Sequence, residues 1–253
     1  MLKNNHNNYK ITYLWTNKIN KNIENKIMSC FNKTFSHKYN NSYFDWKFRK
    51  NPFGKSLHIF VMDKDRIISS RAFWRLDIDN LESYQCVDTA VLPTYQNRGI
   101  FKETILMAFK ILKKKIIYNS PNKNSSPAYQ KSGLKTIKDS NFTKVNFTSL
   151  MLKKAPTIKW DYKILKWRYE ENPIITYYKL KKGNYFYIFR KIKSKFFLLV
   201  GKTKIKLNLT NVNPLICFSY DEVCKGIVIR TRQPWMIKGK VNSKFKSYLF
   251  DLT

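Results

Sequence analysis

The segment PTYQNRGIF, residues 93–101, combines residue types that together can bind an anion. Pro93 ends a strand-like run, and a helical pattern begins at Gly99, directly after Arg98. The first N–H groups of a helix lack partners within the helix and carry a partial positive charge. Glycine lets an anion approach the backbone closely, and Arg98 adds a full positive charge. We therefore expect an anion site at this helix start.

Two common phosphate-binding motifs are absent from the sequence. It contains neither the P-loop pattern GxxxxGKS or GxxxxGKT nor the dinucleotide pattern GxGxxG. The expected anion is therefore neither a nucleoside triphosphate nor a dinucleotide.

The first part of the chain alternates between helical and strand patterns. Helical spacing of apolar residues predicts helices, and runs of β-branched and aromatic residues predict strands. The predicted helices are 19–40, 43–48, 99–115 and 126–133, and the predicted strands are 57–62, 67–76, 83–92, 116–118 and 144–151. This order predicts a mixed α/β domain in which helices flank a central sheet.

The second part of the chain is predicted to be rich in strands. A linker near 153–156 precedes a helix at 160–171, and strand patterns follow at 174–180, 185–192, 196–200, 205–209, 214–220 and 226–232. We therefore expect two domains, 1–154 and a smaller β-rich domain, 157–253. Trp46 and Trp74 are expected in the core, because large aromatic side chains are usually buried.

The composition indicates a folded protein. The 253 residues are 43% hydrophobic and 16% aromatic, which is enough to build real cores. No apolar run approaches the roughly 20 residues that cross a bilayer. The first residues, MLKNNHNNYK, lack the apolar core of a signal peptide, so a cytoplasmic location is expected.

The net charge of +33 has two interpretations. It can attract nucleic acid, anionic lipid or an acidic substrate, or it can reflect an AT-rich coding sequence, because lysine and asparagine are both abundant. The lysines are spread along the chain, and no nucleic-acid-binding motif appears, so a nucleic-acid partner is not expected. The 4 cysteines form no CxxC pair and there are only 3 histidines. We expect reduced thiols and no metal site.

Residues 88–101 resemble the cofactor motif of the GNAT superfamily of acetyl-CoA-dependent N-acetyltransferases. In that motif, a strand ending in small and apolar residues leads to proline and then to Gln/Arg-x-x-Gly-x-Gly/Ala. Gln96 and Gly99 match, whereas Phe101 stands where a small residue is usual. NKN at 122–124 and AYQKSGL at 128–134 are similar to a later segment of the family, with Leu134 in place of an aromatic residue.

The resemblance implies a GNAT-like fold over about residues 20–150 and a site for acetyl-CoA. Strand-edge backbone groups of Ala90 and Val91 would hold the pantetheine arm. Asn122 or Asn124 would contact the amide or diphosphate end, and Tyr129 would lie near the sulfur. The pyrophosphate would be wrapped mainly by N–H groups of Gln96, Asn97, Arg98, Gly99, Ile100 and Phe101.

The resemblance also implies acetyl transfer to a primary amine, with Tyr129 as the acid that protonates the departing thiolate. A backbone N–H near Val91 would hold the oxyanion. Asp88 is the nearest carboxylate for the base. Strand alternation turns it away from the face of Gln85, Val87 and Thr89 unless a bulge intervenes. Glu82, the C-terminal carboxylate of Thr253 and a solvent-assisted route remain alternatives.

The acceptor and the second half of the chain leave several interpretations open. An amino sugar or glycan precursor suits a basic cleft, and Arg230, Arg232 and Trp235 in RTRQPWM are candidates to hold an anionic acceptor. A catalytically inactive GNAT-fold binding module is the alternative function. WKFRKNP at 46–52 is similar to WRYEENP at 167–173, which indicates either a degenerate GNAT-like repeat or coincidence.

Overall fold

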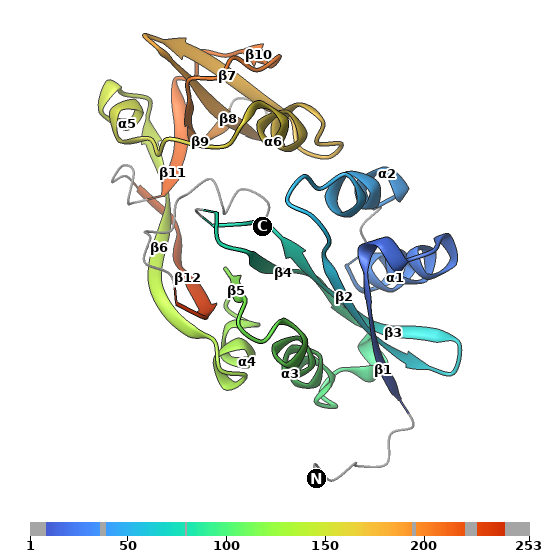
Figure 1. Cartoon of the computed structure of the whole chain (residues 1–253). Helices are drawn as coiled ribbons and strands as arrows, with labels where there is room; N and C mark the ends of the chain where they lie inside the picture. The colour runs from blue at the N-terminus through green and yellow to red at the C-terminus, as the bar shows by residue number, and fades with distance from the viewer. Residues whose placement is uncertain (1–8, 36–38, 79, 194–195, 221–226, 241–253) are drawn as a thin grey trace. The chain divides into compact units, whose positions relative to one another are not determined.

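A computed structural model describes residues 9–35, 39–78, 80–193, 196–220 and 227–240 (Figure 1). The chain divides into two compact units. The first comprises Met1–Asn119, Pro127–Leu134 and Ile237–Lys240, and the second comprises Ser120–Ser126, Lys135–Met236 and Val241–Thr253. The main border therefore lies between residues 119 and 135 rather than at the predicted linker, 153–156.

The first unit contains a mixed sheet, as the sequence predicts. Its strands lie in chain order, and β1 to β4 are antiparallel while β5 runs parallel to β4. The alternating pattern of β1 was not recognised in the sequence, whereas the other four strands were. The strands are β1 (Lys10–Trp15), β2 (Leu57–Asp63), β3 (Arg66–Arg75), β4 (Ser83–Val91) and β5 (Ile116–Asn119).

Helices cover both faces of this sheet. α1 (Lys21–Phe35) packs on β3 and β4, and its Cys30 lies beside Ser70. α3 (Ile100–Leu112) packs on β2 and β3, and its Phe101 lies under Arg71. Adjacent residues of a strand point to opposite faces, so α1 and α3 lie on opposite sides of the sheet. Both helices were predicted, with slightly longer bounds.

A short helix continues into a π-helical turn beside this sheet. Asn40 caps α2 (Asn41–Phe44) by accepting a 3.2 Å hydrogen bond from Tyr43 N–H. The π-helical turn Asp45–Arg49 then buries Trp46, Lys47 and Phe48. Trp74 is also fully buried, and its Nε1–H donates to the Lys47 carbonyl at 2.7 Å. The prediction that both tryptophans belong to the core is confirmed.

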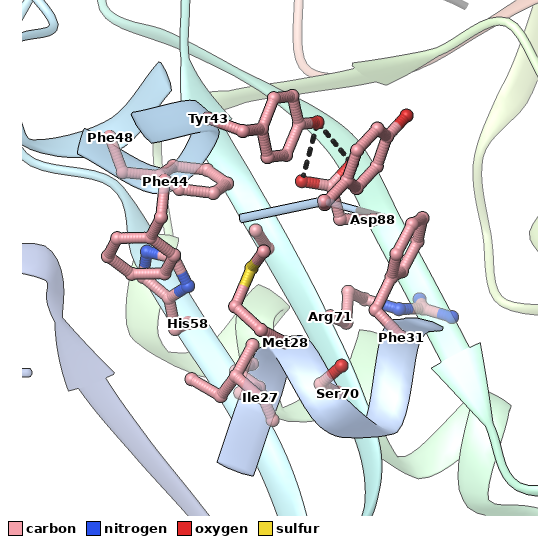
Figure 2. Close-up of a pocket in the computed structure, with 13 residues that line it drawn as sticks. Ile27, Met28, Phe31, Tyr43, Phe44, Phe48, His58, Ser70, Arg71 and Asp88 are labelled. Carbon is pink, nitrogen blue, oxygen red and sulfur yellow. Dashed lines mark hydrogen bonds between the residues drawn. The ribbon is translucent and has the colours of Figure 1, made fainter. Parts of the chain in front are cut away.

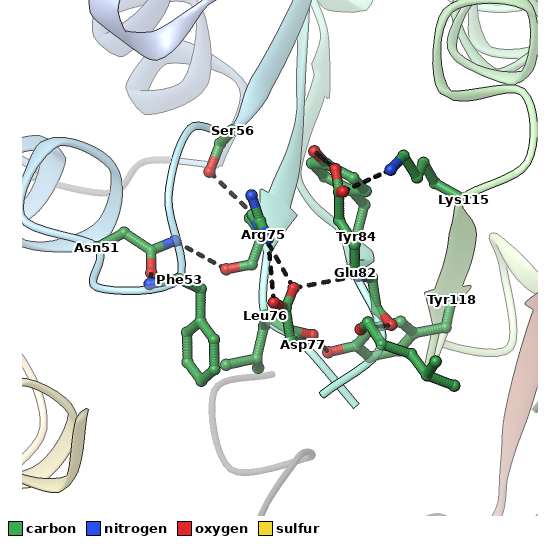
Figure 3. Close-up of polar contacts among 12 residues, drawn as sticks. Asn51, Phe53, Ser56, Arg75, Leu76, Asp77, Glu82, Tyr84, Lys115 and Tyr118 are labelled. Atoms are coloured by element: carbon green, nitrogen blue, oxygen red, sulfur yellow. Dashed lines mark hydrogen bonds and ion pairs between the residues drawn. The ribbon is translucent and has the colours of Figure 1, made fainter. Parts of the chain in front are cut away.

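Polar contacts fasten the end of the sheet where β3 stops and β4 starts (Figure 3). The Asn51 amide donates to the Arg75 carbonyl at 2.7 Å, and the Arg75 guanidinium lies 3.2 Å from Asp77. Lys115, just before β5, reaches Glu82 at 2.5 Å. This end of β4 is therefore closed by side-chain contacts to its neighbours.

The second unit is rich in strands, as predicted. β7, β8 and β9 form an antiparallel meander, β11 runs parallel to β9 and antiparallel to β6, and β10 runs parallel to β7. The strands are β6 (Lys135–Asn146), β7 (Tyr177–Lys182), β8 (Tyr185–Lys193), β9 (Phe196–Thr203), β10 (Thr210–Asn211) and β11 (Ile216–Tyr220). The chain continues into β12 (Ile227–Lys238).

Two strand predictions are wrong. Thr148 accepts a 3.2 Å hydrogen bond from Met151 N–H and starts α5 (Ser149–Lys154), so the strand predicted at 144–151 stops at Asn146. Residues 205–209 form a loop rather than a strand. The Lys179 ammonium donates a 2.6 Å hydrogen bond to the Leu207 carbonyl. In a strand, the backbone N–H of a neighbouring strand would bind this carbonyl instead.

The sequence echo corresponds to a structural repeat. Asp161 caps α6 (Tyr162–Leu165) by accepting from Ile164 N–H at 2.9 Å, as Asn40 caps α2. The π-helical turn Lys166–Glu170 follows and buries Trp167, Arg168 and Tyr169, in the same order of types as the first turn. Antiparallel strands come next in both units. Between β9 and β11, the described chain holds no counterpart of α3.

Candidate functional site

A β-bulge interrupts β4 beside the predicted cofactor turn. Ser70 and Ala72 on β3 pair with Ala90 and Val87, so a step of two residues faces a step of three. Asp88 lies in this bulge with a φ of +47°. The bulge therefore interrupts the strand alternation that would otherwise fix the direction of the Asp88 side chain.

Beyond the start of β4, its edge toward β5 is open. β5 pairs only with Ser83–Gln85, and no described strand continues that pairing along residues 86–91. Leu92 N–H donates to the Ile68 carbonyl at 2.9 Å, so alternation turns the backbone groups of Val91 to the open edge. The carbonyl of Ala90 already accepts a 2.9 Å hydrogen bond from Ser69. Of the two predicted backbone positions, Val91 therefore faces the opening.

The turn after β4 forms the expected helix start. Gly99 precedes α3 with a φ of +80°, and no side chain caps the helix. Asn97 also has a left-handed φ, of +61°. A Cβ added at Gly99 would meet no atom within 4 Å other than those of its chain neighbours, so the space beside the Gly99 Cα is open. An uncapped helix start of this kind is compatible with the predicted anion site, and residues 96–101 are called the cradle below.

Arg98 is held at this cradle by three contacts. Its guanidinium donates to the Thr94 carbonyl at 2.8 Å and to the Tyr9 hydroxyl at 2.6 Å. It also lies 5.3 Å from the centre of the Tyr95 ring. The positive charge is exposed to solvent but has a fixed place beside the turn.

Tyr129 lies in α4 (Ser126–Lys131), and its side chain is buried. Its ring meets Phe101 edge to face, with 5.2 Å between the ring centres. Burial raises the pKa of the Tyr129 phenol, and hydrogen bonding to Cys86 acts in the same direction, while the charge of Arg71 opposes the rise. The phenol therefore keeps its proton at neutral pH.

Asp88 belongs to a partly buried polar group on the face that α1 and α2 cover. The Tyr43 hydroxyl donates to both carboxylate oxygens at 3.1 Å, as Figure 2 shows, and the Lys47 ammonium reaches Oδ1 at 2.8 Å. The Lys47 ammonium also lies 5.4 Å from the centre of the Trp74 ring. Burial, followed by the charge of Asp88, raises the pKa of Tyr43 well above its ordinary value. Asp88 thus acts as the counter-ion of a buried lysine.

A small cavity adjoins this group (Figure 2). Rings from α1 and α2 form one wall, and residues of β2 and β3 form the other, including His58. His58 Nε2 lies 3.2 Å from the Thr16 hydroxyl, and its ring is packed against Phe44 and Phe48. Burial lowers the pKa of His58 to about 3, so this imidazole is neutral.

The remaining predicted residues belong to the second unit, to the start of β4 or to the part of the chain outside the described residues. Asn122 and Asn124 are exposed in the second unit, and the Asn122 side chain accepts a 2.9 Å hydrogen bond from Ser125 N–H. Glu82 is engaged by Lys115 at the closed end of β4. Thr253 lies outside the described residues.

Trp235, one of the three residues predicted to hold an anionic acceptor, is not placed to do so. Trp235 is fully buried, so its ring is not available at the surface. The side chains of Arg230 and Arg232 lie outside the described residues.

Sequence reasoning missed Arg71 on β3. Its side chain is 1% exposed, and none of its three guanidinium nitrogens has a hydrogen-bond partner among the described residues. The guanidinium lies 4.0 Å from the centre of the Phe101 ring and 5.6 Å from that of Tyr129. A charged residue inside the apolar strand run IISSRAFW was the signal that could have revealed it.

Solved structures share this architecture. A putative acetyltransferase from Pyrococcus horikoshii superposes with a TM-score of 0.59 at 14% identity, covering 98% of this chain and 96% of that one. A probable N-acyltransferase from Enterococcus faecalis gives 0.60 at 11% identity, covering 92% and 73%. A GCN5-related N-acetyltransferase from Anabaena variabilis gives 0.59 at 11%, covering 90% and 72%. This chain has the GNAT fold.

Identities this low establish the fold alone. No family model matches the sequence, and no curated protein matches it. Within the GNAT fold of this chain, the predicted cofactor turn is the connection between β4 and α3. None of the described helices is long and apolar enough to span a bilayer.

Proposed function

We propose that the protein is an N-acyltransferase that moves the acetyl group of acetyl-CoA to a primary amine. The observation that carries the proposal is that contacts join three features: Gln96 of the cradle binds Val91 at the open edge, and Phe101 of the cradle packs against the ring of the buried Tyr129. The edge suits an extended amide chain, the cradle suits a diphosphate, and the phenol lies beside Phe101 of the cradle's helix.

The second unit supports the assignment of the open edge. Its strand β9 also has a bulge and, among the described residues, pairs with β11 at Phe197 and Leu198 alone. Lys202 comes directly after the bulge of β9, so its position corresponds to that of Val91 after the bulge of β4. Its N–H donates to the Pro156 carbonyl at 2.8 Å, and its carbonyl accepts from Ile158 N–H at 2.8 Å. An extended chain that offers one carbonyl and one N–H therefore satisfies this kind of edge.

The pantetheine arm of acetyl-CoA is an extended chain with the same two kinds of group. In the first unit, Val91 would hold that arm through its N–H, since its carbonyl already accepts a 3.0 Å hydrogen bond from the Gln96 side chain. The N–H groups of Gly99, Ile100 and Phe101 would bind the diphosphate, and Arg98 would add charge beside it.

Bound acetyl-CoA would supply the acetyl group as an activated thioester. The attacking amine forms a C–N bond as the C–S bond breaks, so one proton must leave the nitrogen and one must reach the sulfur. Tyr129 holds a proton on Oη for the sulfur. Asp88 is our candidate to accept the proton of the amine through water, with Tyr43 and Lys47 holding its carboxylate in place.

For the acceptor, amino sugars and glycan precursors are the first class to test, since the chain is strongly basic and many such molecules are anionic. The pairing of Asp88 with Lys47 favours a second candidate, a binding module that holds acetyl-CoA without turnover. The two functions differ in one readout, the release of free thiol in the presence of amines.

Thermal unfolding with and without acetyl-CoA tests the proposal first. Cofactor at about 100 times its dissociation constant should stabilise the protein by about 2.7 kcal/mol, which raises the melting temperature by several degrees. A thiol-release assay with a panel of amines then separates the enzyme from the binding module. The absence of any shift at millimolar acetyl-CoA would overturn both functions.

A further inference from the structure

Arg71 is a buried cation whose partner is missing from the described residues. No described carboxylate forms an ion pair with it, and its guanidinium nitrogens are unpaired although the side chain is 1% exposed. Burying an unpaired charge is costly, and it is retained in a fold only where something compensates for it. The Phe101 ring, 4.0 Å away, offers partial compensation.

The surroundings of Arg71 place it at the reacting end of the proposed site. Its guanidinium is 5.6 Å from the centre of the Tyr129 ring. Tyr129 in turn lies beside Cys86 and Thr89, and Thr89 lies in the bulge of β4 next to Asp88. The unpaired donors therefore lie between the ring of Phe101, at the start of α3, and the ring of Tyr129, whose phenol would serve the sulfur.

The aromatic residue at position 101 gains a role in this arrangement. Phe101 stands where a small residue is expected, and the guanidinium of Arg71 lies over its ring. An arginine stacked on an aromatic face keeps its N–H donors in a fixed fork, which matches the two oxygens of a carboxylate. A neutral carbonyl would accept a hydrogen bond but would leave the charge uncompensated.

We propose that Arg71, supported by Phe101, binds a carboxylate of one of the two substrates and so determines which substrates the enzyme accepts. This inference rests on the proposed N-acyltransferase function and narrows its substrate class. The carboxylate has two possible sources: an acyl group that ends in a carboxylate, as in succinyl-CoA, or an amino-acid acceptor that carries a carboxylate near its amine.

Calorimetric binding of acetyl-CoA and succinyl-CoA tests the donor source without an acceptor. The variants are Arg71→Met, which removes the charge, and Arg71→Lys, which keeps the charge but loses the fork. If the donor carries the carboxylate, Arg71→Met should weaken succinyl-CoA binding about a hundredfold and acetyl-CoA binding less than about threefold. Arg71→Lys should fall between the wild type and Arg71→Met for succinyl-CoA.

Steady-state kinetics at saturating acetyl-CoA test the acceptor source. Each amino acid is compared with its amide, which keeps the shape and removes the negative charge. If the acceptor carries the carboxylate, the wild type should prefer the acid by about a hundredfold in kcat/KM. Arg71→Met should abolish that preference.

Two controls separate recognition from folding. Arg66→Met removes an exposed arginine from the start of the same strand and should leave both preferences unchanged. Arg71→Met removes an unpaired buried charge, so its melting temperature without ligand should equal or exceed that of the wild type.

The outcomes are distinguishable. A wild type that binds acyl-CoA but shows no carboxylate preference in either experiment overturns the carboxylate site and leaves the proposed function intact. An equal loss of acetyl-CoA and succinyl-CoA binding in Arg71→Met also overturns it, since Arg71 would then serve the shared thioester. A wild type that binds neither acyl-CoA overturns the proposed function and this inference together.

Discussion

Tyr129 keeps its proton because its phenol is buried among groups that disfavour the phenolate. Burial is the dominant cause of the raised pKa, and the nearby charge of Arg71 counteracts it. A nearby cation also stabilises negative charge that develops on the oxygen during proton donation. The residue therefore combines a protonated resting state with local support for giving the proton up.

Tyr129→Phe should lower turnover about a hundredfold or more while leaving acetyl-CoA affinity nearly unchanged. The phenyl ring keeps the edge-to-face contact with Phe101 and removes only the hydroxyl. Steady-state kinetics and calorimetry on the same preparation give the two quantities. Unchanged turnover would show that another group, or water, protonates the sulfur.

His58 should make the protein lose stability on acidification. Its pKa is lowered to about 3 in the folded state, whereas the ordinary value is 6.5, so between these values the unfolded chain binds a proton that the folded chain refuses. The contribution of His58 is complete above pH 6.5 and declines as pH falls, by up to about 1.4 kcal/mol per pH unit.

His58→Phe should therefore flatten the dependence of the unfolding free energy on pH between about pH 6 and pH 4. Urea unfolding at a series of pH values measures it. Thr16→Val is the matched control, because it removes the partner of the imidazole and keeps the titrating group. Equal slopes in His58→Phe and the wild type would assign the acid sensitivity to other residues.

At the scale of elements, the connection between β4 and α3 contains most of the proposed binding groups. The bulge turns Asp88 and the edge of Val91 away from regular alternation, and two left-handed residues then lead into the helix. The donors of the cradle are backbone groups, so the site depends on the path of the chain more than on side-chain identity. A substitution at Gly99 would disturb this backbone path most, because its φ is positive.

Gly99→Asp should abolish acetyl-CoA binding, because a carboxylate would stand in the open space in front of the helix start. Gly99→Asn is the matched control. Both side chains have the same shape, and both tolerate the left-handed φ of +80° better than other residues do. Affinity measured by calorimetry should fall much less in the asparagine variant. Equal affinities in the two variants would contradict an anion at this turn.

The regular elements of the first unit are predictable from sequence because their signals are local. Pro93, Gly99 and the apolar spacing of α3 mark the helix start, and the strand patterns of β2 to β5 are unambiguous. The bulge at Asp88 is not predictable, since one extra residue leaves no trace in an apolar pattern. The role of Arg71 is equally hidden, because its partners Phe101 and Tyr129 come from distant parts of the chain.

In the second unit, the failures have a different cause. The alternating letters of 205–209 look like a strand, yet Leu207 is buried and its carbonyl is held by Lys179, so a loop can use the same pattern. The repeated π-helical turn, by contrast, was visible as an echo around Trp46 and Trp167. Its shared caps and shared buried triplets became evident only in three dimensions.

At the scale of the whole molecule, the two units make different use of one scaffold. Both contain the capped short helix, the π-helical turn and the bulged strand. The second unit lacks a counterpart of α3 in its described residues, and the segment 156–158 takes the open edge of β9. In the part of the chain that the structure describes, the edge beyond the bulge is therefore covered in the second unit and open in the first.

Calorimetry should accordingly detect a single acetyl-CoA site per chain. Gly99→Asp should remove all of the binding heat, because the described residues of the second unit include no counterpart of the helix start at Gly99. A second site in the wild type, or residual binding in the variant, would show that the segment 156–158 can be displaced.

The open edge of β4 also matters for how the protein behaves in solution. A strand edge without a neighbour is a template on which strands of other molecules can grow, and this is a common start of aggregation. The second unit covers its edge with its own segment 156–158, whereas the edge of the first would be covered by the proposed cofactor. Acetyl-CoA would then act as a protective cover as well as a substrate, and material kept with it should remain monodisperse longer than material kept without it.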